Sequence, residues 1–520
     1  MKVLLVTGQL AQDIVKGYAK ESHVETQTLA VKIAVAAFLT PQTIVEQLKN
    51  TKLTGFNMIL TPGLVRGDTS LVSQATGIPT FKGPRYAADL PTVLDSLCEI
   101  QLSTTVPADD LLREKLQQQA LQEIEKTEKN RAELLKKPGS MLIGGLAVGK
   151  DFPMRVLAEI VDAALMDKET IQQTAKRFAA AGADIIDVGM VAGESQPEKA
   201  KCIVEWVKQV VDVPVSIDTL DVAEIKAAVQ AGAELVLSGD AGNIEQIAPF
   251  TSKVAVVVIP TNQRQGYFPK KAQDRVKYLE ETIAKAKKLG VTRCLADLIL
   301  EPTNILESFI AFKEFATRNP DVPLFVGVSN VTELLDADSV GVNALLARLS
   351  QEVDASILLA TEKSDKAKGT VAEEVAAAKM MFLAKKRGSV PKDLGIDLLI
   401  LKDKRNHEEP YDKKLEANAK VVKVSETLEP ATLDCVGMFK ISVDRAQGVL
   451  VAVHYNSLDM VNPVNIVKGE TADGVYAKIV ELGLVSRLDH AAYLGSELAK
   501  AGVALRTGKE YVQDGALFKK

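Results

Sequence analysis

Apolar runs that end on an acidic side chain recur along the middle of the chain. The segment GADIIDVG (182–189) places Asp187 directly after an apolar pair, and PVSID and LVLSGD place Asp218 and Asp240 in comparable positions. Carboxylates at the ends of strands can bind a divalent metal, hold a sugar, or grip the N–H edge of a heterocycle. The sequence therefore predicts a polar ligand site assembled from several strand ends.

Eight short apolar runs between about residues 139 and 390 alternate with amphipathic segments of helical period. The runs are residues 155–160, 183–188, 213–218, 234–239, 254–259, 293–298, 324–329 and 355–360. This number, order and length predict a (β/α)8 TIM barrel, with a doubly wound sheet as the structural alternative. The spacing of Ser195 and Glu198 also predicts a capping box at the start of one helix.

The carboxyl ends of the strands in such a barrel meet at one mouth, where ligands bind. The polar residues at these ends are Glu159, Asp162, Asp187, Asp218, Asp240, Thr261, Asn262, Asp297, Glu301, Ser329, Asn330, Thr361, Glu362, Lys363 and Ser364. Several carboxylates facing one cavity repel one another, so some must find hydrogen-bond donors or take up protons. The opposite mouth has no comparable set.

Three ligand classes suit an acidic mouth, and the sequence separates them. All four histidines (His23, His407, His454, His490) lie outside the predicted barrel, so no resident metal site is expected, although magnesium tolerates an all-oxygen site. A sugar ring would have few aromatic side chains at this mouth on which to stack. A heterocycle with an N–H/NH2 edge fits best, because each charge-assisted bond to a carboxylate is worth roughly 1.5–3 kcal/mol.

The flanking regions predict two further α/β domains. Residues 1–100 contain four short strand candidates (within 2–8, 24–34, 56–63 and 77–83) and resemble a small parallel unit. Residues 101–138 predict a charged helical linker that continues to Pro138-Gly139, and 139–390 form the barrel. In 391–520 the segments 397–403, 438–444 and 448–455 predict strands, and 490–505 predicts a helix.

The composition is that of a globular protein, with 47% hydrophobic residues, 25% charged residues and a net charge of −5. That balance gives no electrostatic basis for binding nucleic acid or an anionic membrane. The four cysteines are far apart, which argues against a disulfide framework and favours a cytoplasmic location. No stretch approaches the roughly 18 apolar residues of a membrane span, and MKVLLVTG predicts a first strand rather than a signal peptide.

The segments GADIIDVG, PVSIDT and AGAELVLSGD resemble the second to fourth strands of pterin-binding barrels, which include dihydropteroate synthases and methyltetrahydrofolate-dependent methyltransferases. GES (193–195) is similar to a synthase loop, whereas GVSNVTELL (327–335) is similar to the seventh strand of the methyltransferases. The flanking regions, including DHAAYLGSELAKAGVAL, resemble archaeal dihydropteroate synthase-related proteins. The resemblance covers all eight predicted strands and implies a reduced pterin as substrate or ligand.

The resemblance assigns candidate roles by position. It makes Asp218 the third-strand pterin contact and Asp297 the deep acid on the 2-amino/N3 edge, with Glu301 as its rival. Asn330 matches the methyltransferase asparagine near N5. Asp187 and Asp240 complete the candidate pterin set, and Glu159, Asp162 and Ser329 are further mouth residues.

The mouth departs from the synthases in its charge. A departing diphosphate needs cations, yet no arginine follows Ser329-Asn330, so Arg264, Lys363 and Lys366 are the candidate anion-binding residues. The main hypothesis is condensation of a pterin diphosphate with an arylamine, with Mg²⁺ accompanying the diphosphate, in tetrahydromethanopterin- or folate-type cofactor biosynthesis. The alternatives are pterin-dependent methyl transfer with a corrinoid partner protein, and non-catalytic pterin binding. The resemblance also implies a homodimer.

Overall fold

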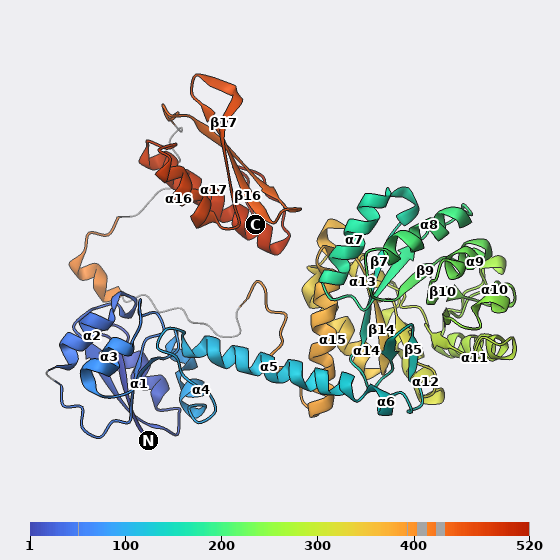
Figure 1. The fold of residues 1–520 in the computed structure, drawn as a ribbon, viewed down its shortest axis with the longest axis horizontal. Coiled ribbons are helices and arrows are strands. Elements are labelled where there is room, and N and C mark those ends of the chain that lie inside the picture. Colours follow the sequence, from blue (N-terminus) through green and yellow to red (C-terminus); the bar gives the residue numbers. More distant parts are fainter. Residues whose placement is uncertain (50, 393, 403–412, 423–431, 519–520) are drawn as a thin grey trace. The chain divides into compact units, whose positions relative to one another are not determined.

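In the computed structural model, which describes residues 1–49, 51–392, 394–402, 413–422 and 432–518, eight parallel strands close into a barrel. They are β7 Arg155–Ile160, β8 Ile185–Gly189, β9 Val215–Asp218, β10 Leu235–Gly239, β11 Ala255–Val258, β12 Cys294–Ala296, β13 Leu324–Val326 and β14 Ala355–Thr361. The ring closes between the first and last strands, where β7 pairs with β14. The predicted (β/α)8 barrel is thus confirmed, and Figure 1 shows its strands inside a ring of helices.

Helices follow the strands and cover the outside of the barrel. They are α7 Lys168–Ala180, α8 Pro197–Lys208, α9 Val222–Gln230, α10 Ile244–Thr251, α11 Ala272–Lys288, α12 Ile305–Arg318, α13 Ser329–Thr332, α14 Ser339–Glu352 and α15 Thr370–Arg387. Side-chain caps fix the starts of α7 and α9: Asp221, for example, accepts a hydrogen bond from the Glu224 N–H at 2.9 Å. Buried apolar side chains of helices and strands form the main core between the two layers.

The predicted capping box at Ser195 is wrong. Helix α8 begins at Pro197 with Gln196 at its N-cap, and Ser195 is exposed. The backbone N–H of Gln196 instead donates to the buried Glu224 carboxylate at 2.8 Å. A tertiary hydrogen bond therefore fixes this helix start in place of the local capping pair.

A short hairpin closes the end of the barrel at which the strands begin. It consists of β5 Met141–Ile143 and β6 Leu146–Val148, joined by Gly144-Gly145. Ile143 and Val148 are fully buried and pack with the inward-facing side chains near the strand starts. The interior is therefore filled at this end, and the polar residues lie at the opposite end.

Helix α5 (Ala108–Lys129) connects the N-terminal region to the barrel and packs against it. It ends earlier than predicted, and the short helix α6 (Arg131–Leu134) follows it. Ala120 is fully buried in the barrel's main core, Glu128 pairs with Arg155 of β7 at 2.8 Å, and Glu123 pairs with Arg387 of α15 at 2.8 Å. The charged helix therefore bridges the first and last elements of the barrel.

The N-terminal region forms a parallel sheet, as the sequence predicted, and its strand order is β2-β1-β3-β4. Its strands are β1 Lys2–Gly8, β2 Glu25–Val31, β3 Met58–Thr61 and β4 Thr80–Lys82, and its helices are α1 Gln12–Ala19, α2 Pro41–Leu48, α3 Ser70–Thr76 and α4 Leu90–Asp95. Apolar clusters lie on both faces of the sheet.

The described residues after Leu398 belong to a second compact unit. Strands β15 (Met438–Asp444), β16 (Val449–Asn456) and β17 (Asp459–Gly469) form an antiparallel sheet. Helices α16 (Ala472–Glu481) and α17 (Leu488–Thr507) pack on it, burying Phe439, Leu450 and Leu498.

The strand predicted at 397–403 is wrong for its described part, 397–402. None of these residues lies in a strand, and Leu399, Ile400 and Leu401 are more than half exposed. Asp403 lies outside the described residues. An apolar run needs a pairing partner to become a strand, and the local pattern cannot supply one.

The four cysteines are free thiols, as the sequence predicted. Within the described part of the chain, none of the helices is both long enough and apolar enough to cross a membrane.

Candidate active site at the barrel mouth

Three carboxylates from adjacent strands converge at the barrel mouth. The strand register places Glu159 of β7 beside Asp187 of β8, and Asp187 beside Ser216 of β9. Side chains alternate along a strand, so Ser216 and Asp218 lie on one face. Glu159, Asp187 and Asp218 each offer an oxygen, and these oxygens all lie within 4.8 Å of one another.

Asp187 is the deepest of the three. Its side chain is fully buried, and its Oδ1 accepts a hydrogen bond from the Ser216 hydroxyl at 2.5 Å. Its Oδ2 has no hydrogen-bond partner among the described residues. Burial, with the nearby charges of Asp218 and Glu159, raises the pKa of Asp187 well above its ordinary value.

The other two carboxyl groups are also shifted toward neutrality. Burial raises the pKa of Glu159 to about 8, and the charges of Asp218 and Asp162 add to this effect. Burial raises the pKa of Asp218 to about 7. Lys363 acts in the opposite direction on Glu159, but its ammonium is paired with Asp162 at 2.7 Å. Near neutral pH the three carboxyl groups are therefore not all ionised, unless a ligand supplies positive charge.

Asp297 adds a fourth buried carboxyl directly after β12. Its Oδ1 accepts the backbone N–H of Ile299 at 2.8 Å. Burial raises the pKa of Asp297 to about 7, and the charge of Asp218 contributes, which places these two acids within electrostatic reach of each other.

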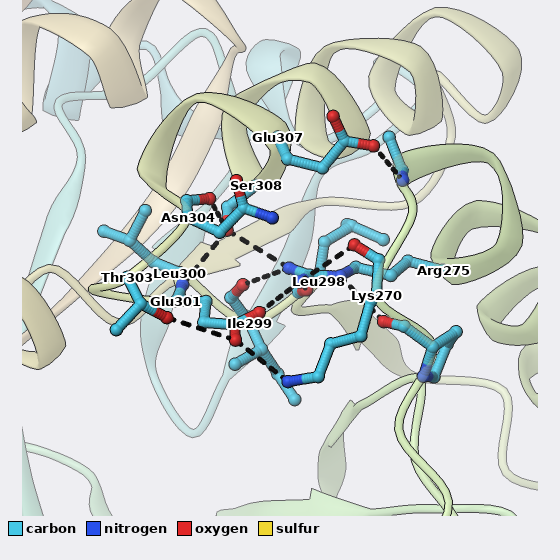
Figure 2. A network of polar contacts seen from close by, with 12 residues as sticks. Lys270, Arg275, Leu298, Ile299, Leu300, Glu301, Thr303, Asn304, Glu307 and Ser308 are labelled. Atoms are coloured by element: carbon cyan, nitrogen blue, oxygen red, sulfur yellow. Dashed lines mark hydrogen bonds and ion pairs between the residues drawn. The ribbon is translucent and has the colours of Figure 1, made fainter.

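A buried arginine holds the loop that carries Asp297. Arg275 of α11 is fully buried and donates to the carbonyls of Pro269 and Ile299 at 3.0 Å, and to the Ser308 hydroxyl at 3.1 Å. Figure 2 shows this network, in which Arg275 also pairs with Glu301 at 2.5 Å. Ile299 has φ +63°, a conformation that β-branched residues avoid, so the surrounding hydrogen bonds must hold it there.

Two of the predicted pterin contacts are occupied by the protein itself. The carboxylate of Asp240 accepts bonds from the N–H groups of Gly242, Asn243 and Gln263 and from the Thr261 hydroxyl, at 2.7–3.0 Å. Glu301 is paired with Lys270 at 2.9 Å and with Arg275. These acids therefore shape the loops around the mouth.

The residues after β13 have different surroundings. The Ser329 hydroxyl is buried and accepts the Thr361 N–H of β14 at 2.7 Å. The side-chain amide of Asn330 donates to the Leu300 carbonyl at 3.3 Å. Asn330 thus contacts the same loop that carries Asp297, as a shared binding site requires.

The candidate anion-binding residues are dispersed. Arg264 is exposed and donates to Gln246, whereas Lys366 donates to the carbonyls of Thr332 and Leu335. Lys363, with 63% of its side chain exposed, is the one of the three that acts electrostatically on Glu159. The mouth is therefore acidic, as the sequence predicted.

Two important residues escaped the sequence analysis. Ser216 lies two positions before Asp218, and period-two alternation signals that both face inward. Arg275 follows Ala272 by three positions and precedes Leu279 by four, which places a charge on the apolar stripe of α11. A charge at such a position indicates a buried network.

Three family models match separate parts of the chain. "Pterin binding enzyme" matches residues 159–361, within the barrel. "Family of unknown function (DUF6513)" matches 1–85, and "PterinBD-DUF4346" matches 433–514. The match to the barrel includes Glu159 at its start and Thr361 at its end.

Relatives and solved structures were also found. "Uncharacterized protein MJ0107" of Methanocaldococcus jannaschii is 42% identical over 100% of this chain and 99% of its own length. The dihydropteroate synthase from Xanthomonas albilineans in complex with 7,8-dihydropteroate is 19% identical, with a TM-score of 0.39, over 49% of this chain and 100% of that one. The Yersinia pestis enzyme with a pterine-sulfa conjugate is 20% identical, with a TM-score of 0.39, over 48% and 99%. The chain therefore belongs to the family of the M. jannaschii protein, and its barrel is similar to the "Pterin binding enzyme" family over residues 159–361.

Proposed function

We propose that the barrel mouth binds a reduced pterin and catalyses a dihydropteroate synthase-like condensation in tetrahydromethanopterin- or folate-type cofactor biosynthesis. The observation that carries this proposal is the pair Asp218 and Asp297. Both carboxyls are shielded at the mouth, each has a pKa of about 7, and no basic side chain of the described residues forms an ion pair with either. Such groups are suited to a ligand that brings its own N–H donors.

The ring orientation follows from the surroundings of the two acids. Asp297 lies on the loop held by Arg275, so it can accept the 2-amino and N3–H donors of a pterin in a fixed orientation. Asp218 projects from β9 toward the other ring nitrogens. Asn330 contacts the Asp297 loop through Leu300 and is suited to the N5 edge. Asp187 lies beside Asp218, on the neighbouring strand.

The condensation joins the arylamine nitrogen to the methylene carbon on pterin C6. The new C–N bond forms as the C–O bond to the diphosphate breaks, and the amine gives up one proton. The departing diphosphate needs positive charge, and Lys363 is the candidate anion-binding residue that acts on Glu159. Mg²⁺ would accompany the diphosphate, for which carboxylate oxygens are suitable ligands.

Calorimetric titration of the full chain with 6-hydroxymethyl-7,8-dihydropterin tests the binding step. We expect Asp297→Asn to weaken binding by roughly 10- to 150-fold, because it removes charge-assisted bonds worth about 1.5–3 kcal/mol. Asp221→Asn is the matched control, since asparagine caps the start of α9 as well as aspartate does. Equal affinities for the wild type and Asp297→Asn would refute the assignment.

A second assay tests the chemical step. Pterin diphosphate and an arylamine should release diphosphate together, and Lys363→Ala should slow this release. Binding of the pterin without diphosphate release would reject the condensation. The same sample would then be tested for methyl transfer from a methylated pterin to a corrinoid, with Asn330→Ala as the diagnostic variant.

A further inference from the structure

The acidic trio, Glu159, Asp187 and Asp218, has the spacing of a cation site. Its ligand oxygens lie within 4.8 Å of one another. Oxygens around one hard cation lie about 3–4.8 Å apart when the metal–oxygen bonds are about 2.1–2.4 Å long. The three side chains come from three neighbouring strands, so the barrel itself holds their backbones in place.

An orphaned oxygen within the trio points to a missing partner. The side chain of Asp187 is fully buried, and its Oδ2 has no hydrogen-bond donor among the described residues. A buried carboxylate oxygen without a partner is unfavourable, typically by several kcal/mol for a charged group. The ammonium that acts on the trio, Lys363, is already paired with Asp162. The charge of the trio is therefore not matched by a described side chain.

Gly189 preserves the space that Glu159 occupies. A Cβ atom at position 189 would overlap Oε1 of Glu159 and approach the Ile160 carbonyl to 3.2 Å. The φ of Gly189 is not in the left-handed region, so its backbone conformation does not demand glycine. Glycine here serves to let the Glu159 carboxylate lie against the backbone of β8, beside Asp187.

We propose that Glu159, Asp187 and Asp218 bind one hard divalent cation, Mg²⁺ or Mn²⁺, at the barrel mouth in the absence of any pterin or diphosphate. Three carboxylate oxygens without a nitrogen or sulfur ligand select this class of metal over zinc or copper. Water molecules complete the coordination sphere, because Mg²⁺ retains several of them. The site does not rest on the proposed condensation, since it needs no substrate.

Titration of the metal-free full chain with Mn²⁺, followed by the electron paramagnetic resonance signal of the free ion, tests the proposal. We expect one Mn²⁺ bound per chain and its displacement by Mg²⁺. Glu159→Gln should weaken Mn²⁺ binding at least about tenfold, since losing a direct ligand exceeds the roughly 10- to 100-fold losses seen for outer-shell partners. Asp167→Asn should bind as the wild type does: this exposed acid lies outside the trio and caps the start of α7, where asparagine caps as well as aspartate does.

The outcomes are decisive in both directions. Absence of Mn²⁺ binding by the wild type, or equal binding by Glu159→Gln, would overturn the proposal. If Glu159→Gln does not fold, as judged by the fluorescence of the single tryptophan, Trp206 of α8, Asp187→Asn replaces it. That variant is isosteric and keeps a carbonyl oxygen for Ser216. Because the titration contains no pterin, its failure leaves the pterin assay with Asp297→Asn unaffected.

Discussion

Replacing Arg275 with methionine should both destabilise the barrel and weaken pterin binding. Methionine fills the apolar part of the site but donates no hydrogen bond. The variant leaves the carbonyls of Pro269 and Ile299 without their 3.0 Å donors, and it removes the charged partner of Glu301. Glu301 retains Lys270, and Ser308 retains its bond to the Asn304 carbonyl. Arg275 also donates to the Leu298 and Lys270 carbonyls, but at 3.4 Å, so the main loss is the two 3.0 Å bonds and one ion pair.

The magnitude follows from these groups. Two orphaned carbonyls cost about 1 kcal/mol each at the lower end of the range, and the charge-assisted bond to Glu301 contributes about 1.5–3 kcal/mol. We expect the free energy of unfolding to fall by about 3–5 kcal/mol, which lowers Tm by roughly 6–20 °C for a barrel of this size. Arg275→Lys keeps the charge but has at most three donors. Its free energy of unfolding should therefore lie between those of the wild type and Arg275→Met.

Trp206 fluorescence during urea unfolding reports on the barrel, because this single tryptophan lies on α8. The control is Arg293→Met, which removes one hydrogen bond, at 2.8 Å, to the solvent-accessible Lys253 carbonyl and should change stability by less than about 0.5 kcal/mol. Calorimetry with reduced pterin gives the second readout: Ile299 should relax from its φ of +63° and misplace Asp297. An Arg275→Met barrel within about 1 kcal/mol of the wild type would refute this reasoning.

Three further perturbations have defined outcomes. Glu374 is fully buried with both carboxylate oxygens unpartnered among the described residues, and burial raises its pKa well above the usual value. Glu374→Met should therefore raise the free energy of unfolding by about 1–4 kcal/mol at pH 8. The gain should be smaller near pH 4, where the Glu374 carboxyl is protonated in both the folded and the unfolded chain. An equal gain at both pH values would contradict this. Burial raises the pKa of Asp434, but hydrogen bonds from Ser486 and His490 outweigh it and hold that pKa well below its usual range. Asp434→Asn should thus lower the melting temperature of the second unit at pH 7, with a difference that shrinks as pH falls below about 4; a pH-independent difference would be inconsistent with a charged Asp434. Gly189→Ala should displace Glu159 and weaken Mn²⁺ binding at least about tenfold while the chain stays folded. An unchanged affinity for Mn²⁺ would show that the site does not need the space left by Gly189.

The barrel was predictable because each strand carries its own signal. Runs such as RVLAEI (155–160) combine β-branched and apolar residues with a polar end, and the structure gives β7 these same bounds. The predicted strand at 397–402 had a similar apolar run, but none of these residues lies in a strand. The helix start at Pro197 depends on Glu224 of α9, distant in sequence, and the local Ser195 pattern could not reveal this.

The sequence predicted which acids lie at the mouth, but not which of them converge and which are satisfied by the protein's own hydrogen bonds. The register that brings Glu159 beside Asp187 depends on how three strands pair, which no single segment encodes. Asp240 directly follows β10, so backbone N–H groups of the next loop satisfy it, whereas Asp187 lies inside β8 and retains an orphaned oxygen. The sequence places both acids after an apolar run and does not reveal where each strand ends.

Helix α5 contacts the barrel on both sides of the closure, where its first and last strands pair. Glu128 holds Arg155 at the start of the ring, Glu123 holds Arg387 at its end, and Ala120 fills the core between them. A gene fragment that begins at Pro138-Gly139, where the composition changes, would therefore encode a barrel without helix α5 and its contacts. Residues upstream of that turn help to hold the first and last strands of the barrel together. A fragment should therefore start near Ala108 if it is to fold on its own.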